Sequence, residues 1–523
     1  MYKYYIKTFG CRLNISESES MIYELKLNNF ITTENKEEAQ FFIINSCTVT
    51  EKADKKVKSF INSIRKYKKS IIITGCGNYK NDIENKVFFI DNKRKGNIIN
   101  FILNNISDIL NNGIFGNISN KNIKKENLLK YNLINNYLNN KNEKSEINEN
   151  RFFKPSLESL THTKAFLKIQ DGCNQQCTYC KVRFVRGNSV SLNHQIILDY
   201  LQKIKDSGFK DVVLTGINLA SYNDGEFNFS NLLNLITEKY KDLNFTISSI
   251  EVNYLDNDFY KIIERENIKP YFHLPLQSGS QKILELMKRN YSIDYYKEKV
   301  LKIKEVKKDS FISTDIIVGF PGESDYDFKE TLKVINEIKY SFLHIFPFSF
   351  REETIAYQFY KLNEVDKNII KKRLEIIQKL NEELNKNYIE KILNKKLKFY
   401  NKILVEDIYF KDSNLIIEGS NYYNIKSVVN ISLDEKNINL IKLFYKDLVN
   451  NSFNFYKINE FYSYLNSSGI NLNKDIMIKS INFKDITINK GDYFLNESLI
   501  FKYKKDLKER KGYLYASWNW WSR

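Results

Sequence analysis

Short apolar runs alternate with helical patterns along most of the chain. In the first hundred residues, three apolar runs of strand length each end in a cysteine: YYIKTFGC, FFIINSC and SIIITGC. Between them, SESESMIYELKLNNF and TEKADKKVKSFINSIRKY carry apolar residues at helical spacing. Strands that alternate with helices predict a parallel α/β sheet.

The same alternation returns between Thr163 and about Phe350. Six apolar runs there have strand length, and most are followed by a segment with helical spacing: FLKIQDG, DVVLTGIN, FTISSIE, FHLPL, STDIIVGF and FLHIFPF. Six strand–helix units are typical of a partial TIM-like (β/α)6 barrel, whose working residues lie at the carboxyl ends of the strands.

The other segments have different patterns. The Asn-rich stretch after the first sheet is poorly periodic, which is typical of a linker. After the barrel we expect a long amphipathic helix, with apolar residues at Ile370, Leu374, Ile377, Leu380 and Leu384. Short runs with turns then predict a small all-β module. The expected divisions are 1–104, a linker at 105–160, the barrel domain at 161–392, the β module at 393–455 and an extension of unknown role at 456–523.

Length and composition bound the class of protein. A chain of 523 residues is too long for one ordinary core, so about two to four domains are expected. No window approaches the roughly 20 uninterrupted apolar residues of a membrane span, and the N-terminus lacks the sections of a signal peptide. We therefore expect a cytoplasmic protein in a reducing compartment, with no membrane partner.

The net charge of +18 suits a polyanionic partner, because each neutralised phosphate releases counterions and adds affinity. However, Asn, Lys and Ile dominate the composition, as an AT-rich coding bias would produce. Charge alone therefore leaves the partner open. It also leaves open the role of the aromatic C-terminus, which holds every tryptophan of the chain: Trp518, Trp520 and Trp521.

All six cysteines fall into two triplets. Cys173, Cys177 and Cys180, the central triplet, lie within eight residues directly after a predicted strand. A structural zinc site normally takes four ligands, whereas a 4Fe–4S cluster held by three cysteines leaves one iron open to a non-protein ligand. An open iron beside a barrel mouth is suited to chemistry, so the spacing favours a cluster over structural thiols.

Cys11, Cys47 and Cys76, the N-terminal triplet, are far apart in the sequence, but each directly follows a predicted strand. Neighbouring parallel strands would bring the three thiols to one edge of the sheet. Two interpretations stay open on the residues alone: a second 4Fe–4S cluster with one vacant iron, or buried structural cysteines.

The stretch KIQDGCNQQCTYCK resembles the signature of the radical S-adenosylmethionine (radical SAM) superfamily. The resemblance implies that the open iron chelates S-adenosylmethionine, whose one-electron cleavage gives a 5′-deoxyadenosyl radical that attacks C–H bonds. Tyr179 matches the superfamily's aromatic residue near the adenine. The resemblance implies further cofactor contacts at the ends of later barrel strands: Thr215, Gly216, Asn218, Ser249, Glu251, Gln277 and Gly319.

The segments TFGCRLNISESE, INSCTVT and TGCGN resemble the N-terminal domain of the methylthiotransferases, which holds an auxiliary cluster. HIFPFSFREETIA resembles the barrel end of that family, and the region of Asn421, Tyr422 and Tyr423 resembles its small β "TRAM" module. The resemblance covers roughly residues 1–100 and 160–455. It implies two 4Fe–4S clusters, with sulfur delivered at the second, and a methylthio product.

The family's substrates are isopentenyladenosine in tRNA, threonylcarbamoyladenosine in tRNA, and an aspartate of a ribosomal protein. GCRLN together with KIQDGC is most similar to the bacterial threonylcarbamoyladenosine branch, which implies the tRNA anticodon stem-loop and a low-potential electron donor such as flavodoxin or ferredoxin as partners. In one departure, KVRFVRGNSVS lacks the family's Ile-Pro and second arginine, which puts substrate contacts near Arg183 and Arg186 in doubt.

Two functions from other classes remain as alternatives. A two-cluster electron carrier would need closed four-cysteine clusters, which two triplets cannot supply. A non-catalytic RNA-binding protein would hold structural zinc in place of iron. The exact nucleoside, the electron donor, the sulfur source and the oligomeric state cannot be read from the sequence.

Overall fold

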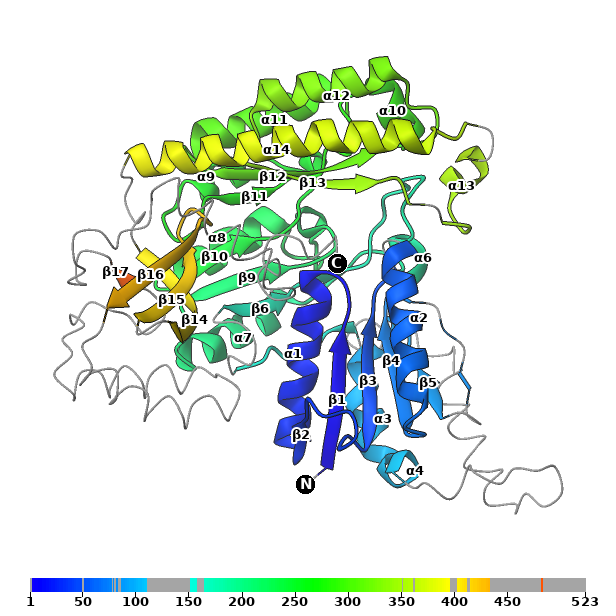
Figure 1. The fold of residues 1–523 in the computed structure, drawn as a ribbon. Coiled ribbons are helices and arrows are strands. Elements are labelled where there is room, and N and C mark those ends of the chain that lie inside the picture. Colours follow the sequence, from blue (N-terminus) through cyan, green and yellow to red (C-terminus); the bar gives the residue numbers. More distant parts are fainter. Residues whose placement is uncertain are drawn as a thin grey trace.

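A computed structural model of the protein describes the residues listed at the end of this sentence, and Figure 1 shows their arrangement: 2–48, 51–77, 79, 81–82, 86–110, 151–157, 164–349, 351–360, 363–395, 402–411, 414–432 and 481–482. Most of the expected linker lies outside the described residues. So does nearly all of the expected C-terminal extension, including Trp518, Trp520 and Trp521.

The N-terminal part of the chain forms a parallel sheet in the order β2-β1-β3-β4-β5, as its alternating pattern predicts. Every residue of β3 and β4 is buried, which explains why both strands are continuous apolar runs and do not alternate. The strands are β1 (Tyr2–Thr8), β2 (Phe30–Thr32), β3 (Phe41–Ser46), β4 (Ser70–Gly75) and β5 (Val87–Phe89).

Helices cover both faces of this sheet (Figure 1). On one face, α2 (Glu51–Arg65) buries Val57, Ile61 and Ile64, whose spacing is that of one helical stripe. On the other face, α1 (Arg12–Leu27) and α3 (Ile98–Asn104) pack into a separate apolar cluster, followed by the short α4 (Ile106–Leu110). The helices predicted between the strands are thus α1 and α2.

The second part of the chain is an open barrel of parallel strands with helices outside it (Figure 1). The pairing runs β6-β9-β10 and β11-β12-β13, and a parallel bridge between Ser249 and His273 links the two groups. All six predicted strands are present, which confirms the α/β barrel: β6 (Ala165–Lys168), β9 (Asp211–Thr215), β10 (Asn244–Ile247), β11 (Tyr271–His273), β12 (Phe311–Val318) and β13 (Phe342–Pro347).

The barrel helices pack on the outer face of these strands in one large apolar cluster. They are α7 (His194–Asp206), α8 (Phe229–Lys239), α9 (Asn257–Ile263), α10 (Gln281–Leu286), α11 (Ile293–Val306) and α12 (Asp325–Ile338). Two further helices lie outside this cluster: α6 (Val182–Arg186) and α13 (Ile355–Tyr360), whose Ala356 belongs to a smaller cluster with Phe320. A short antiparallel pair, β7 (Gln170–Asp171) with β8 (Val190–Ser191), brackets the loop that carries the central triplet.

The predicted amphipathic helix is α14 (Lys367–Lys395), which buries Ile377 and Leu384. Its Asn381 Oδ1 accepts a hydrogen bond from the Leu343 N–H of β13 at 2.7 Å. After it come antiparallel strands, as expected for a small β module; their likeness to a TRAM module stays a prediction. They are β14 (Lys402–Lys411), β15 (Asn414–Asn421), β16 (Lys426–Ser432) and β17 (Ile481–Asn482). Among the described residues, the helices are all too short or too polar to span a membrane.

Candidate functional site

The central triplet lies on the loop between β7 and α6. The Gln175 N–H donates to Cys173 Sγ at 3.4 Å, and the Val182 N–H donates to Cys180 Sγ at the same distance. Burial raises the pKa of Cys173 to about 11 and that of Cys180 to about 12, and Cys177 adds to both shifts. The three thiols therefore lie close together in a desolvated site, as the spacing predicts.

A buried arginine joins the central triplet to the end of β10. Arg289 Nη1 donates to Cys177 Sγ at 3.3 Å, while its Nη2 lies 2.5 Å from the Glu251 carboxylate. Its Nε donates to the Tyr291 hydroxyl at 3.0 Å. Glu251, a predicted cofactor contact, thus has a cation as its partner in the protein, and its contact with the cofactor stays a prediction.

The end of β9 carries three of the predicted cofactor contacts. The Ile217 and Asn218 N–H groups both donate to Gln170 Oε1 at 2.9 Å. A Cβ on Gly216 would lie 2.9 Å from that same oxygen, so the close approach of Gln170 explains the glycine. Some side-chain polar atoms at these strand ends are buried without a hydrogen-bond partner among the described residues: Thr215 Oγ1, Asn218 Nδ2 and Ser248 Oγ.

The other predicted cofactor contacts lie at neighbouring strand ends. Gln277 has a positive φ of 70°, and its N–H donates to the Asp315 carbonyl oxygen at 2.8 Å. Gly319 also has a positive φ, 80°, and a Cβ there would lie 2.5 Å from the Ile370 side chain. Tyr179 is partly buried against the end of β12. Ser249 stands beside these at the β10–β11 junction.

The N-terminal triplet lies at the carboxyl ends of β1, β3 and β4. The Cys76 N–H donates to the Ser46 carbonyl oxygen at 2.9 Å, which ties the third cysteine to the second. A Cβ on Gly10 would lie 2.8 Å from Cys47 Sγ, so the residue before Cys11 touches Cys47. Burial raises the pKa of Cys11. Strand order thus brings three distant cysteines to one edge.

Both triplets meet chemical requirements of an iron–sulfur cluster. In the described part of the chain, no three or more His, Cys, Asp or Glu side chains converge as ligands of a single ion do. Cluster thiolates bind different irons and need not converge. The unpartnered polar atoms beside the central triplet also fit a polar cofactor, because buried polar groups are normally hydrogen-bonded.

A second buried arginine, which follows the central triplet in the sequence, contacts the N-terminal triplet. Arg186 follows Cys180 on α6 and has no exposed surface; its Nε donates to Cys76 Sγ at 3.1 Å. Its Nη1 donates to Glu17 Oε1 at 3.2 Å and to Asp171 Oδ1 at 2.9 Å, and its Nη2 donates to Asn14 Oδ1 at 2.8 Å. Arg186 is fully buried, and it links the barrel to the N-terminal sheet.

Two lysines complete this network. Lys95 contacts Glu17, and Lys168 lies 2.9 Å from Glu17 and 2.6 Å from Asp171. Burial alone would raise the pKa of Glu17, but the surrounding cations lower it to about 2. The network thus holds three buried cations against two carboxylates, and we call these five residues the junction network: Glu17, Lys95, Lys168, Asp171 and Arg186.

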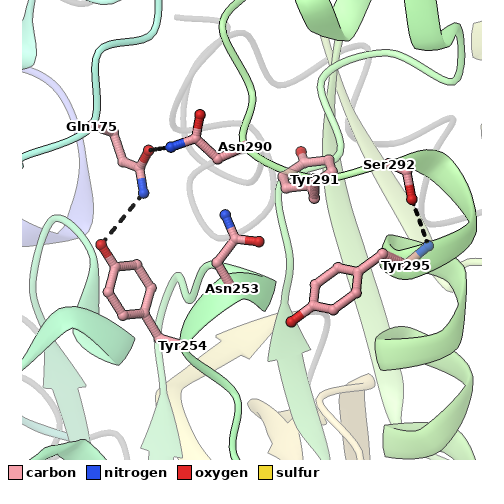
Figure 2. Close-up of a pocket in the computed structure, with 7 residues that line it drawn as sticks. All are labelled: Gln175, Asn253, Tyr254, Asn290, Tyr291, Ser292 and Tyr295. Atoms are coloured by element: carbon pink, nitrogen blue, oxygen red, sulfur yellow. Dashed lines mark hydrogen bonds between the residues drawn. The ribbon is translucent and has the colours of Figure 1, made fainter.

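A pocket of about 640 Å³ opens beside the central triplet. Figure 2 shows Gln175, from the cysteine loop, between Tyr254 and Asn290: Gln175 Nε2 donates to the Tyr254 hydroxyl at 3.4 Å, and Asn290 Nδ2 donates to Gln175 Oε1 at 3.5 Å. The lining is polar but uncharged: Gln175, Asn253, Tyr254, Asn290, Tyr291, Ser292 and Tyr295.

Comparison with known proteins agrees with this arrangement. Residues 167–335 match the radical SAM superfamily, and residues 3–91 match an uncharacterized protein family, UPF0004. The threonylcarbamoyladenosine tRNA methylthiotransferase MtaB of Thermotoga maritima is 30% identical over 437 residues, which cover 80% of this chain and 90% of that protein. This chain belongs to the radical SAM methylthiotransferases. It is therefore an enzyme of tRNA modification that uses S-adenosylmethionine and a 4Fe–4S cluster.

Other methylthiotransferases are equally similar. The tRNA-2-methylthio-N(6)-dimethylallyladenosine synthase of a Hydrogenobaculum species is 32% identical over 419 residues, covering 77% of this chain and 88% of that protein. Among solved structures, the radical SAM methyltransferase TsrM from Kitasatospora setae aligns with a TM-score of 0.43 and 11% identity, over 68% of this chain and 77% of that one.

Sequence reasoning did not find the charged groups around the two triplets of this methylthiotransferase. Arg289 is 112 residues from Cys177, and Arg186 is 110 residues from Cys76. One feature of the sequence pointed to these charged groups. The helix predicted to cover the sheet carries polar residues, and in the structure α1 buries Asn14, Glu17 and several serines. Buried polar residues on a covering helix indicate a polar partner.

Proposed function

We propose that this enzyme adds a methylthio group to C2 of N6-threonylcarbamoyladenosine beside the tRNA anticodon, using two 4Fe–4S clusters. The observation that carries the proposal is the contact of Arg186, at the end of the short helix after the central triplet, with Cys76 of the N-terminal triplet. Methylthio transfer to an aromatic carbon needs a radical source and a sulfur source beside the same carbon. An arginine that follows one thiol set in the sequence and contacts the other supports this arrangement.

The central triplet would hold the cluster that binds S-adenosylmethionine, and the N-terminal triplet would hold a second cluster. When bound, these groups supply the radical that activates the carbon and an iron that carries sulfur. The chain prepares both places in the same way: Arg289 and Arg186 each donate a hydrogen bond to one cysteine sulfur. Charge-assisted hydrogen bonds favour the thiolate, which is the form that binds iron.

The same barrel mouth has to admit the substrate. The target carbon is hidden in a base stack, so the anticodon stem-loop must present a flipped or unstacked base. The net charge of +18 supports an RNA partner over a protein one. A low-potential electron donor such as flavodoxin or ferredoxin would supply the reducing electron.

The choice of nucleoside rests on GCRLN and KIQDGC, and relatives named for threonylcarbamoyladenosine in four bacteria support it. Isopentenyladenosine (dimethylallyladenosine) is the second candidate, because relatives named for it have 31–32% identity. An aspartate of a ribosomal protein is a third.

The test is mass spectrometry of tRNA nucleosides. The gene is expressed in a bacterial strain that lacks its own tRNA methylthiotransferases, and digested tRNA is compared with that of the empty strain. We expect 2-methylthio-N6-threonylcarbamoyladenosine to appear with the wild-type gene and to be absent when the N-terminal triplet is replaced by alanine. Appearance of the methylthio isopentenyl nucleoside alone would assign the protein to the second candidate.

A further inference from the structure

The inner face of β11, β12 and β13 carries polar side chains that neither triplet uses. His273 pairs with Ser313 across β11 and β12, and Asp315 pairs with His344 across β12 and β13. Because side chains alternate along a strand, these four residues share one face. The opposite face, with Ile312 and other apolar residues, packs against the barrel helices.

These inner-face residues form one connected group. His273 Nε2 lies 3.3 Å from Asp315 Oδ1, and His273 Nδ1 lies 3.0 Å from Ser313 Oγ. The His273 and His344 rings meet edge to face with their centroids 5.1 Å apart. The side chains of His273 and Asp315 keep 12% and 23% of their surface exposed, so a ligand can reach them. Asp315 has its own partner in His273.

Arg12 reaches this face from the N-terminal domain. Its guanidinium lies over the Tyr271 ring, 5.5 Å from the centroid, and Tyr271 is the first residue of β11. Burial, with His273 and Arg12 nearby, lowers the pKa of His344 to about 3, so His344 is neutral at pH 7. Within the described residues, Arg12 makes no ion pair. Arg12 is thus a half-buried guanidinium that faces the barrel.

We propose that Arg12 binds the carboxylate of the threonylcarbamoyl group, while Asp315 accepts hydrogen bonds from the hydroxyl or N–H donors of the same group. This inference rests on the proposed function and identifies the residues that would recognise the modified nucleoside. Arg12 directly follows Cys11, so a carboxylate held there keeps the nucleoside beside the N-terminal triplet. Guanidinium and carboxylate form paired, charge-assisted hydrogen bonds, which gives this contact directional selectivity.

The arrangement also discriminates against an apolar substituent. A dimethylallyl group placed against Arg12 and Asp315 would remove water from both charges and return no hydrogen bond. A site built to bind a polar substrate group rejects an analogue that lacks it more strongly than an apolar pocket rejects a missing methylene. The inner face therefore favours the carboxylate-bearing nucleoside over the isopentenyl one.

The test uses the full-length protein, reconstituted anaerobically with iron and sulfide, and three anticodon stem-loop RNAs. The RNAs carry N6-threonylcarbamoyladenosine, its methyl ester, or dimethylallyladenosine at the target position. Dissociation constants from fluorescence anisotropy and kcat/KM for methylthio product are measured for wild type, Arg12→Gln and Arg12→Lys. Arg65→Gln, an exposed arginine at the end of α2, is the matched control for general charge.

We expect the wild type to bind the acid about tenfold or more tightly than the ester, as a hydrogen bond to a charged group implies. Arg12→Gln should abolish this preference by weakening only the acid, Arg12→Lys should retain part of it, and Arg65→Gln should leave it unchanged. Equal binding of acid and ester by the wild type, or a preference that survives in Arg12→Gln, overturns the role of Arg12. A wild type that converts the dimethylallyl RNA but not the acid overturns the proposed function itself.

Discussion

The junction network predicts that Arg186 stabilises the iron-loaded protein more than the iron-free protein. Its three cations and two carboxylates are at most 5% exposed, so solvent screens them little. Burial lowers the pKa of Lys95 to about 8, which still leaves it largely protonated at neutral pH. The network thus carries one excess positive charge, and the guanidinium of Arg186 is the group of the network that contacts Cys76 Sγ.

The perturbation is Arg186→Met, which keeps an unbranched apolar stem and removes the charge. Without iron, burial raises the pKa of Cys11, which favours its neutral thiol, and the variant leaves two cations against two carboxylates. With iron, a three-thiolate cluster carries about one negative charge, and the variant leaves it without a counter-charge. One hydrogen bond to a charged group contributes about 1.5–3 kcal/mol. We therefore expect iron affinity to fall by about 2 kcal/mol, roughly thirtyfold.

The assay measures iron transfer to a chelator in a protein whose central triplet is replaced by alanine, so that only the N-terminal site is observed. Arg65→Met, on the exposed end of α2, is the control. Glu17→Gln changes the charge in the opposite direction, because it leaves three cations of the junction network against one carboxylate. It should therefore destabilise the iron-free protein and leave the iron affinity unchanged or higher. The reasoning is refuted if Arg186→Met destabilises both forms equally and leaves iron affinity unchanged, because Arg186 would then only fasten the two domains.

Other predictions concern the two triplets and the RNA. The reconstituted wild type should contain about eight irons by colorimetric analysis, and alanine replacement of the central triplet should leave about half; full retention would contradict the ligand assignment. Replacement of the N-terminal triplet should abolish methylthio product while chromatography still detects 5′-deoxyadenosine, whereas equal loss of both would favour a structural role for that domain. Gly10 has a φ of +105°, and a Cβ there would lie 2.7 Å from Cys47 Cβ. Gly10→Ala should therefore lower the free energy of unfolding by more than about 1 kcal/mol and remove iron from the N-terminal triplet only. An unchanged iron content would show that the backbone around the N-terminal triplet can shift to accommodate the Cβ. RNA affinity should fall steeply between low and physiological salt, and a flat salt profile would argue against phosphate contacts.

The fold could be predicted from the sequence because its strands are nearly pure apolar runs. β3 and β4 are buried along their whole length, and the glycine or cysteine that ends each run marks the carboxyl edge of the sheet. Three cysteines at the ends of neighbouring parallel strands must share that edge, so their gathering follows from strand order alone. Local spacing was sufficient for the central triplet as well.

The charged surroundings could not be predicted, because each contact joins segments that no local pattern relates. The departure in KVRFVRG raised doubt about Arg186 as a substrate contact, and the structure gives the reason, since Arg186 is buried against Asp171 and Glu17. Gly216 is one of the expected cofactor contacts. The group that approaches it in the structure is Gln170, and the contact with a cofactor stays a prediction.

The start of α1 carries residues of the N-terminal triplet, of the proposed substrate contact and of the junction network. Cys11 directly precedes α1, the Arg12 guanidinium lies over Tyr271 of the barrel, and Asn14 and Glu17 accept hydrogen bonds from Arg186. At 3.6 residues per turn, these side chains leave the helix in different directions, yet one rigid backbone carries them all. A shift of this helix would move the thiol edge and the guanidinium together. Because of that coupling, transplanting the N-terminal domain of a relative should transfer the residue at position 12 and its contact with the substrate along with the cysteines, so nucleoside preference would follow the N-terminal domain as well as the barrel.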